Sequence, residues 1–139
     1  ITVIDDFGHH PTAVRETIDA ARQRYAGRPI VAVFEPRSYT AQRRESQEPY
    51  IEAFAAAEMV VLAGLFHPER YSAETAMNPH EVVEALRAQG KHAAYMEEVD
   101  EIVRDLAERL RGNEVVLFMS NGGFGGIHGK LLDALRARG

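Results

Sequence analysis

The sequence predicts an α/β protein of the three-layer, Rossmann-like class, with a mostly parallel sheet of five or six strands and helices on both faces. Short apolar runs of strand length alternate five times with segments of helical period along the 139 residues. Strands joined by helices form parallel sheets with right-handed crossovers. The chain is also long enough for one ordinary hydrophobic core and too short for two large ones. We therefore expect one domain that covers residues 1–139.

Five apolar runs are the expected strands. Each is short and rich in β-branched or other apolar residues, a composition typical of strands that are buried on both faces of a sheet. In chain order they occupy residues 1–4, 30–34, 59–64, 92–96 and 114–120.

The segments between these runs repeat apolar residues at the helical period, so each is expected to bury one helix face. The expected faces are Val14, Ile18, Ala21 and Tyr25; then Val99, Ile102, Val103, Leu106 and Leu110; and finally Ile127, Leu131, Leu132 and Leu135.

Proline and glycine mark the ends of these helices. Pro11 and Pro79 suit first helical turns, whereas Gly27 and Gly90 stand just beyond helix ends, where glycine is common. Pro49 interrupts the helical segment 41–57, so it is a candidate start for that helix.

Composition excludes several classes of protein. No apolar run approaches the roughly 20 residues that a membrane-spanning helix needs, and the N-terminus lacks a signal pattern. We therefore expect a soluble protein with no membrane insertion. The absence of cysteine excludes disulfides and thiolate chemistry and is consistent with a cytoplasmic protein, the location that we expect. A formal charge of −5 without a long basic cluster argues against nucleic acid as a partner.

Chemically active residues follow four of the expected strands. DDFGHHP follows the first, EPRSYTAQRR the second, LFHPERYSAETAMNP the third and SNGGFGGIHGK the fifth. Ligands of parallel α/β sheets bind beyond the carboxyl ends of the strands. One edge of the sheet should therefore collect acids, histidines, arginines and a glycine-rich loop.

The glycine-rich loop lies within MSNGGFGGIHGK, residues 119–130. It is neither a P-loop, which needs glycine at Phe124 and Ser or Thr at Leu131, nor a dinucleotide fingerprint, which needs glycine at His128. Two interpretations remain. The loop binds a carboxylate or phosphate at the N-terminus of the next helix, or it is a tight turn between strand and helix.

The stretch DDFGHHP places two carboxylates and two imidazoles ahead of a helix. Asp6 is a candidate to bind a ribose hydroxyl and His9 to bind phosphate or substrate, whereas the alternative is a helix cap with a solvated histidine. A metal-dependent hydrolase that uses Asp5, Asp6, His9 and His10 is a further hypothesis. Against it, adjacent histidines after a strand should point apart, and no third ligand stands at useful spacing.

Three arginines, Arg37, Arg43 and Arg44, follow the second strand. Surface arginines are usually only solvated. Arg37 is the best candidate for a site because it lies close to the strand end, and its guanidinium can hold a carboxylate in a bidentate pair. The segment 65–79 is long for a connection, which favours a lid or substrate loop.

Three stretches of the chain resemble the Mur ligases. Asp6-Phe7-Gly8-His9-His10-Pro11 is similar to the D-x-x-H-x-P element that opens the C-terminal domain of these ligases and of folylpolyglutamate synthases. FEPRSYT (34–40) and MSNGGFGGIH (119–128) are similar to one branch, the murein peptide ligases. After Arg37 the chain lacks both arginines of the L-alanine-adding branch, which indicates a different incoming amine.

The resemblance implies a three-domain, ATP-dependent ligase in which this chain is the C-terminal domain. The N-terminal domain, for the UDP-sugar, and the central ATPase domain, with the Mg²⁺ ligands, would be further parts of the same polypeptide. The partners would be UDP-N-acetylmuramate and a murein tripeptide, L-Ala-γ-D-Glu-meso-diaminopimelate, recycled from the cell wall. The family would also supply a strand before Ile1, expected to be antiparallel.

The resemblance also implies roles for individual residues. Asp6 would meet the ribose of ATP, and Phe7 would lie beside the nucleotide or the incoming amine. His9 and His10 would border the reacting centre as the catalytic residues, and no metal ligand would come from this domain. Six residues would line the tripeptide pocket: Arg37, Ser38, Thr40, Asn121, Gly122 and Gly123.

Two other identities stay open. One is the C-terminal domain of a UDP-N-acetylmuramate:L-alanine ligase, which shares the element around Asp6. The other is a Rossmann-like module that binds a small anion without catalysis.

Overall fold

One five-stranded sheet forms the centre of the molecule in the computed structural model, which describes residues 1–36, 42–64, 75–120 and 122–138. The strand order is β1-β5-β2-β3-β4, and all four neighbouring pairs are parallel. The predicted fold class is therefore confirmed. The strands are β1 (Thr2–Asp6), β2 (Ile30–Phe34), β3 (Met59–Ala63), β4 (His92–Met96) and β5 (Val115–Met119).

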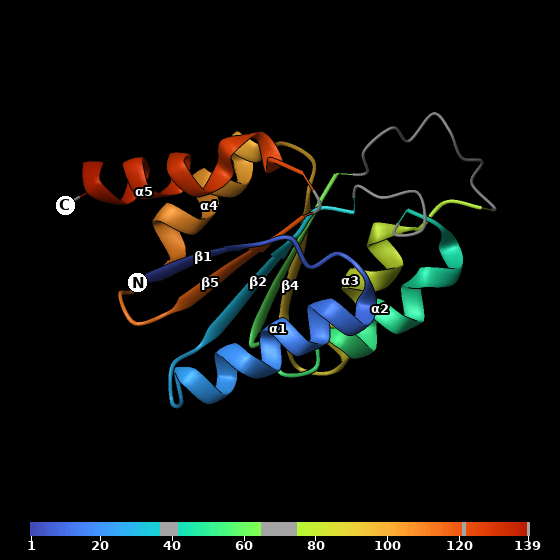
Figure 1. Cartoon of the computed structure of the whole chain (residues 1–139). Helices are drawn as coiled ribbons and strands as arrows, with labels where there is room; N and C mark the ends of the chain where they lie inside the picture. Colours follow the sequence, from blue (N-terminus) through green and yellow to red (C-terminus); the bar gives the residue numbers. More distant parts are fainter. Residues whose placement is uncertain (37–41, 65–74, 121, 139) are drawn as a thin grey trace.

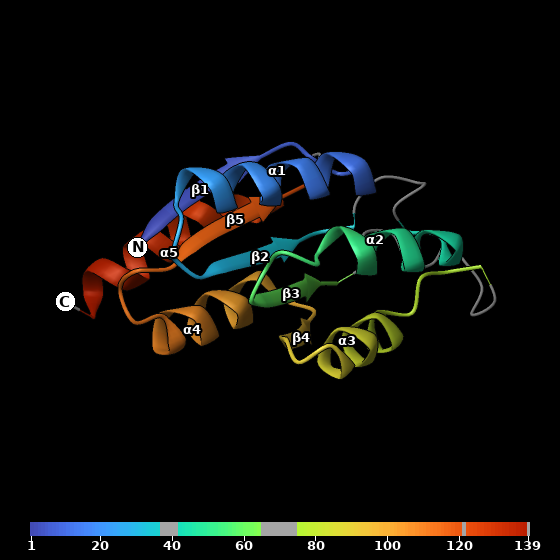
Figure 2. The ribbon, with the colours of Figure 1, turned by 90° about the horizontal axis from the view of Figure 1, so that it is seen from below.

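Helices cover both faces of this sheet and make three layers (Figures 1 and 2). α1, α2 and α3 share a core with one face, and α4 and α5 share a second core with the other face. The helices are α1 (Pro11–Arg24), α2 (Gln47–Ala53), α3 (Pro79–Ala88), α4 (Val99–Arg109) and α5 (Ile127–Ala137), with 3₁₀ turns η1 (Arg44–Ser46) and η3 (Phe124–Gly126).

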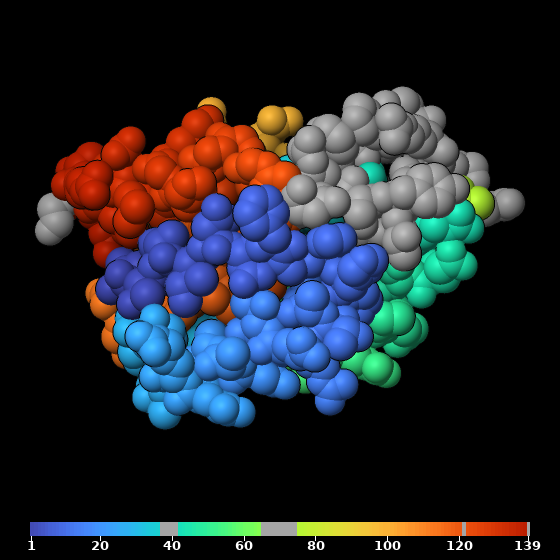
Figure 3. All heavy atoms as spheres, viewed as in Figure 1, coloured from blue at the N-terminus to red at the C-terminus, as the bar shows by residue number. Residues whose placement is uncertain are grey.

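Burial differs between the central and the edge strands. Every residue of β2, β3 and β5 is buried, as the apolar runs predict. The prediction is wrong for β1 and β4, which are partly exposed because, in the described part of the chain, each pairs with a strand on one side only. Figure 3 shows β1 at the surface between α1 and α5.

The structure confirms the predicted starts of two helices and corrects the start of a third and the buried face of a fourth. Pro11 and Pro79 are the first residues of α1 and α3. α2 begins at Gln47 rather than at Pro49, because a proline in the first turn of a helix loses no hydrogen bond. Leu132 is 37% exposed, whereas Ile127 and Leu131 are fully buried, so the apolar face of α5 is narrower than predicted.

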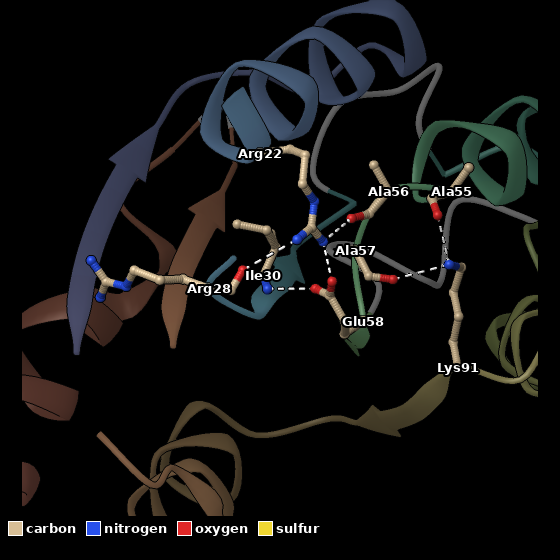
Figure 4. Close-up of polar contacts among 8 residues, drawn as sticks. All are labelled: Arg22, Arg28, Ile30, Ala55, Ala56, Ala57, Glu58 and Lys91. Carbon is tan, nitrogen blue, oxygen red and sulfur yellow. Dashed lines mark hydrogen bonds and ion pairs between the residues drawn. The ribbon is translucent and has the colours of Figure 1, made fainter. Parts of the chain in front are cut away.

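A polar network ties α1 to the amino ends of β2 and β3 (Figure 4). The Arg22 guanidinium donates to the carbonyl of Ala56 at 2.6 Å and pairs with the Glu58 carboxylate. Oε2 of Glu58 accepts from the backbone N–H of Ile30 at 2.6 Å. Lys91 donates to two further carbonyls of the same turn, at 2.7 and 3.0 Å. These contacts lie at the end of the sheet opposite the predicted site.

Within the described residues, no helix combines the length and the apolar character that crossing a membrane requires.

Candidate functional site

The carboxyl ends of β1, β5 and β2 lie side by side. Met119 pairs with Asp6 on one side and with Phe34 on the other. The ladder continues one residue further, because Ser120 N–H donates to the carbonyl of Asp6 at 3.2 Å and Glu35 N–H donates to that of Met119 at 3.0 Å. The segments that follow these three strands therefore start from one place, as predicted from the parallel sheet.

The carboxylate of Asp6 holds the turn that leaves β1. Its Oδ1 accepts from the N–H of Gly8 at 2.6 Å and from the Thr17 hydroxyl at 3.4 Å. A Cβ atom at residue 8 would lie 2.8 Å from this oxygen, closer than real contacts allow. A larger residue at position 8 would therefore displace the Asp6 carboxylate. Both hydrogen bonds use Oδ1.

The rings of His9 and His10 lie against each other, with centroids 4.4 Å apart and planes at 38°. The expectation that they point apart is wrong, because β1 ends at Asp6 and the alternation of side chains along a strand ends with it. Nδ1 of His9 lies 3.0 Å from the carbonyl of Phe7, whose own side chain is 72% exposed. His10 is the N-cap of α1 but makes no capping bond with its side chain.

Tyr50 of α2 holds the turn that contains His9 and His10. Its hydroxyl donates to the backbone carbonyl of His9, and its ring packs against Phe34 with centroids 4.7 Å apart. Burial raises the pKa of Tyr50 well above its ordinary value of 10, so the phenol remains a hydrogen-bond donor. The histidine turn is thus anchored to the core through one side chain.

The described residues do not gather a metal-binding cluster. No group of three or more His, Asp or Glu side chains among them is placed to hold a metal ion. Asp5 instead lies near α5, where its Oδ2 is 3.8 Å from Nδ1 of His128. The described part of the chain thus adds no support to the hypothesis of a metal-dependent hydrolase.

The glycine-rich loop turns tightly into α5. Phe124, Gly125 and Gly126 all have positive φ, at 50°, 59° and 70°. Phe124 is buried and packs edge-on against Phe118, with ring centroids 6.1 Å apart. The turn is what the simpler interpretation of the loop predicts. The N-cap of α5 is Gly126, which has no side chain to cap the helix, and this is compatible with an anion at this helix end.

Two side chains that the sequence did not single out connect these segments. Ser120, 2% exposed, donates from Oγ to Oε1 of Glu35 at 2.6 Å and accepts from the N–H of Gly122 at 3.1 Å. Each of Ser120 and Glu35 is the first residue after a buried strand. Their position directly after a strand was the only feature of the sequence that could have indicated a role for them. Nothing in the sequence shows that β2 and β5 are neighbours.

Part of the predicted site lies outside the described residues. This holds for four of the six predicted pocket residues: Arg37, Ser38, Thr40 and Asn121. It also holds for most of the expected substrate loop, residues 65–74. Gly122 and Gly123 are described and stand at the carboxyl edge, directly before η3.

The other two arginines after β2 contact acids. One guanidinium nitrogen of Arg44, Nη2, donates to both carboxylate oxygens of Glu81 at 2.8 and 2.9 Å, and Arg43 pairs with Glu45. Arg44 thus connects η1 to the first turn of α3, as a structural surface arginine would.

Known proteins are similar to this chain in both sequence and fold. The family model described as "Mur ligase, glutamate ligase domain" matches residues 1–122. A UDP-N-acetylmuramate–L-alanine ligase of Burkholderia thailandensis is 34% identical over 139 residues, which are 99% of this chain and 30% of that protein. The chain thus spans 30% of the length of the curated relatives it matches.

Two crystal structures superpose on most of the chain. A Haemophilus ducreyi domain, assigned to a UDP-N-acetylmuramate:L-alanyl-γ-D-glutamyl-meso-diaminopimelate ligase, has a TM-score of 0.72 and 34% identity, with 96% of this chain and 89% of that chain covered. A murein peptide ligase of Psychrobacter arcticus has a TM-score of 0.77 and 30% identity, with 96% of this chain and 27% of that chain covered.

Proposed function

The chain belongs to the Mur ligase family, and from this premise we propose that it is the C-terminal domain of an ATP-dependent ligase for cell-wall peptide recycling. The ligase joins UDP-N-acetylmuramate to L-Ala-γ-D-Glu-meso-diaminopimelate. The likeness to a murein peptide ligase at 30% identity supports this substrate pair. The main support for the proposal is that the segments after β1, β2 and β5 all begin side by side at one edge of the sheet.

On the nucleotide side, the residues present fit a ribose better than a metal ion. Oδ2 of Asp6, which takes no part in the two bonds that hold the turn, would accept from a ribose hydroxyl of ATP. The exposed ring of Phe7 would lie beside the nucleotide or the incoming amine. The ligands of Mg²⁺ would come from the central domain, as the resemblance to the Mur ligases implies.

On the peptide side, the tripeptide pocket would be lined by Arg37, Ser38, Thr40, Asn121, Gly122 and Gly123. A guanidinium and the free N–H groups of a helix start suit the carboxylates of the tripeptide. ATP supplies the phosphoryl group that converts the carboxylate of UDP-N-acetylmuramate into an acyl phosphate, which the peptide amine attacks with release of phosphate.

The contribution of this domain would be positioning and exclusion of water. His9 and His10 would border the reacting centre, where their turn is held by Tyr50 and by Asp6. Closure of the domain on the other two would shield the acyl phosphate from hydrolysis. The chain without the other two domains is therefore expected to show no ligation.

A second candidate function is the addition of L-alanine to the same UDP-sugar. The 34% identity to the Burkholderia thailandensis ligase favours it. Ser38 and Ala41 stand where the L-alanine-adding branch has arginines, which disfavours it.

A comparison of amines in the full-length protein separates the two. With UDP-N-acetylmuramate and ATP, we expect ligation of the tripeptide and little ligation of L-alanine. Arg37→Ala should raise KM for the tripeptide between about 10-fold and 150-fold, the loss of about 1.5 to 3 kcal/mol from a charged hydrogen bond, and leave KM for ATP within about twofold. Asp6→Ala should raise KM for ATP and leave KM for the tripeptide nearly unchanged. Faster ligation of L-alanine would establish the second function, and absence of any ligation would favour the anion-binding module.

A further inference from the structure

Ser120 is buried at the point where three strands end, and both its backbone N–H and its hydroxyl bond to residues at these strand ends. Its backbone N–H reaches Asp6 at the end of β1. Its hydroxyl donates to Glu35 after β2 and accepts from Gly122 after β5. The Ser120 hydroxyl is a donor to one segment and an acceptor from another. A shift of either segment should therefore affect the other.

The bond to Glu35 has the geometry of a strong hydrogen bond. An O–H donor at 2.6 Å from a carboxylate oxygen lies in the short range of charge-assisted bonds. Glu35 is half-buried, and its backbone is fixed by the N–H bond to Met119. Pro36, which follows, is buried. The side chain of Glu35 thus joins a rigid strand end to Ser120.

The bond from Gly122 sets the direction in which the glycine-rich loop leaves β5. A serine hydroxyl that accepts from the N–H two residues later makes a local turn. Because the same hydroxyl donates to Glu35, the geometry of this turn depends on a residue 85 positions away. We name the contact between Glu35, Ser120 and Gly122 the clasp.

We infer that Ser120 is a positioning residue, which through the clasp holds the glycine-rich loop and the segment after β2 at the spacing that the incoming peptide requires. This inference rests on the proposed function, which assigns both loops to the tripeptide. Ser120 itself would not contact the reacting groups, since it is 2% exposed. Its effect should therefore appear in KM for the tripeptide rather than in kcat or in KM for ATP.

The clasp is tested in the full-length protein by hydrogen–deuterium exchange at the amide of Gly122. Ser120→Ala removes the acceptor of this amide, so its exchange should become at least tenfold faster. Glu35→Ala should also accelerate this exchange, although Glu35 does not contact Gly122. Glu35→Gln keeps an acceptor oxygen for the Ser120 hydroxyl and should restore most of the protection. Unchanged exchange in both alanine variants would overturn the clasp.

The positioning role is tested by kinetics on the same variants. Ser120→Ala and Glu35→Ala should each raise KM for the tripeptide about tenfold, or by about 1.4 kcal/mol, and leave kcat and KM for ATP within about twofold. Glu35→Gln should leave KM for the tripeptide close to that of the unsubstituted protein.

Glu114 offers a matched control at the other end of β5. Its carboxylate also holds a backbone turn, through the N–H groups of Arg111 and Gly112 at 2.8 to 3.0 Å. Glu114→Ala should lower stability without changing KM for the tripeptide.

Two results would contradict the inference in different ways. Faster exchange at Gly122 with an unchanged KM for the tripeptide would overturn the positioning role and leave the clasp as a structural contact. A full-length protein that ligates no tripeptide before any substitution would overturn the proposed function, and with it the role toward the peptide. The exchange comparison would then still decide whether Ser120 couples the two loops.

Discussion

The hydroxyl of Tyr50 on α2 donates a hydrogen bond to the backbone carbonyl of His9, 41 positions earlier in the chain. Through this bond the turn that carries both histidines is attached to the core beneath the sheet. The Tyr50 ring itself is 1% exposed and packs against Phe34 and Phe54. Hydrogen bonding and packing can be separated here, because phenylalanine keeps the ring and lacks the hydroxyl.

Tyr50→Phe should lower the free energy of unfolding by about 1 kcal/mol, the net worth of one buried hydrogen bond, as measured by urea denaturation. It should also reduce kcat of the full-length ligase, since His9 and His10 lose their anchor. Tyr95→Phe is the matched control, because among the described residues the Tyr95 hydroxyl bonds to the exposed carboxylate of Glu97, at 3.4 Å. Equal effects of the two substitutions would show that the bond to His9 has no special role.

Gly8→Ala should displace the Asp6 carboxylate, because the added Cβ would lie 2.8 Å from its Oδ1. We expect KM for ATP to rise about tenfold in the full-length ligase, with a smaller change for the tripeptide. Gly129→Ala is the control, because a Cβ there meets nothing within 4 Å and alanine stabilises a helix by about 0.5 to 1 kcal/mol over glycine. An unchanged KM for ATP in Gly8→Ala would count against contact between Asp6 and the nucleotide.

Arg22→Ala should destabilise the fold without altering catalysis. The substitution removes the bonds to the Ala56 carbonyl and to Glu58 at the amino edge of the sheet (Figure 4). We expect a loss of about 1 to 3 kcal/mol in urea denaturation and unchanged KM values. Arg136→Ala removes only an exposed pair with Asp133 and should cost less than about 0.5 kcal/mol. A raised KM in Arg22→Ala would show that the two edges of the sheet are coupled.

Glu114 should make stability depend on pH in the acidic range. Burial disfavours its ionised form, but the backbone N–H groups of Gly112 and Arg111 outweigh burial and hold the pKa of Glu114 below its ordinary value. A lowered pKa in the folded state means that the stabilisation is complete above the unfolded pKa and is lost as pH falls through the folded one. Glu114→Gln should therefore reduce stability at pH 7 more than at pH 3. An equal loss at both values would exclude this linkage.

The turn after β1 shows which parts of the site the sequence could predict. Asp6 and the histidines were recognisable because they are close in sequence and form one motif. The relative orientation of the two rings was predicted wrongly, because it depends on where β1 stops, and that is set by pairing with β5.

The sequence by itself determined the order and type of the elements and the edge of the sheet that gathers the candidate site residues. These follow from local burial periods and from the direction that all parallel strands share. Only the tertiary structure decided that β5 lies between β1 and β2. The clasp between Glu35 and Ser120 depends on that order, because packing of the whole sheet, rather than any local pattern, brings together two residues 85 positions apart.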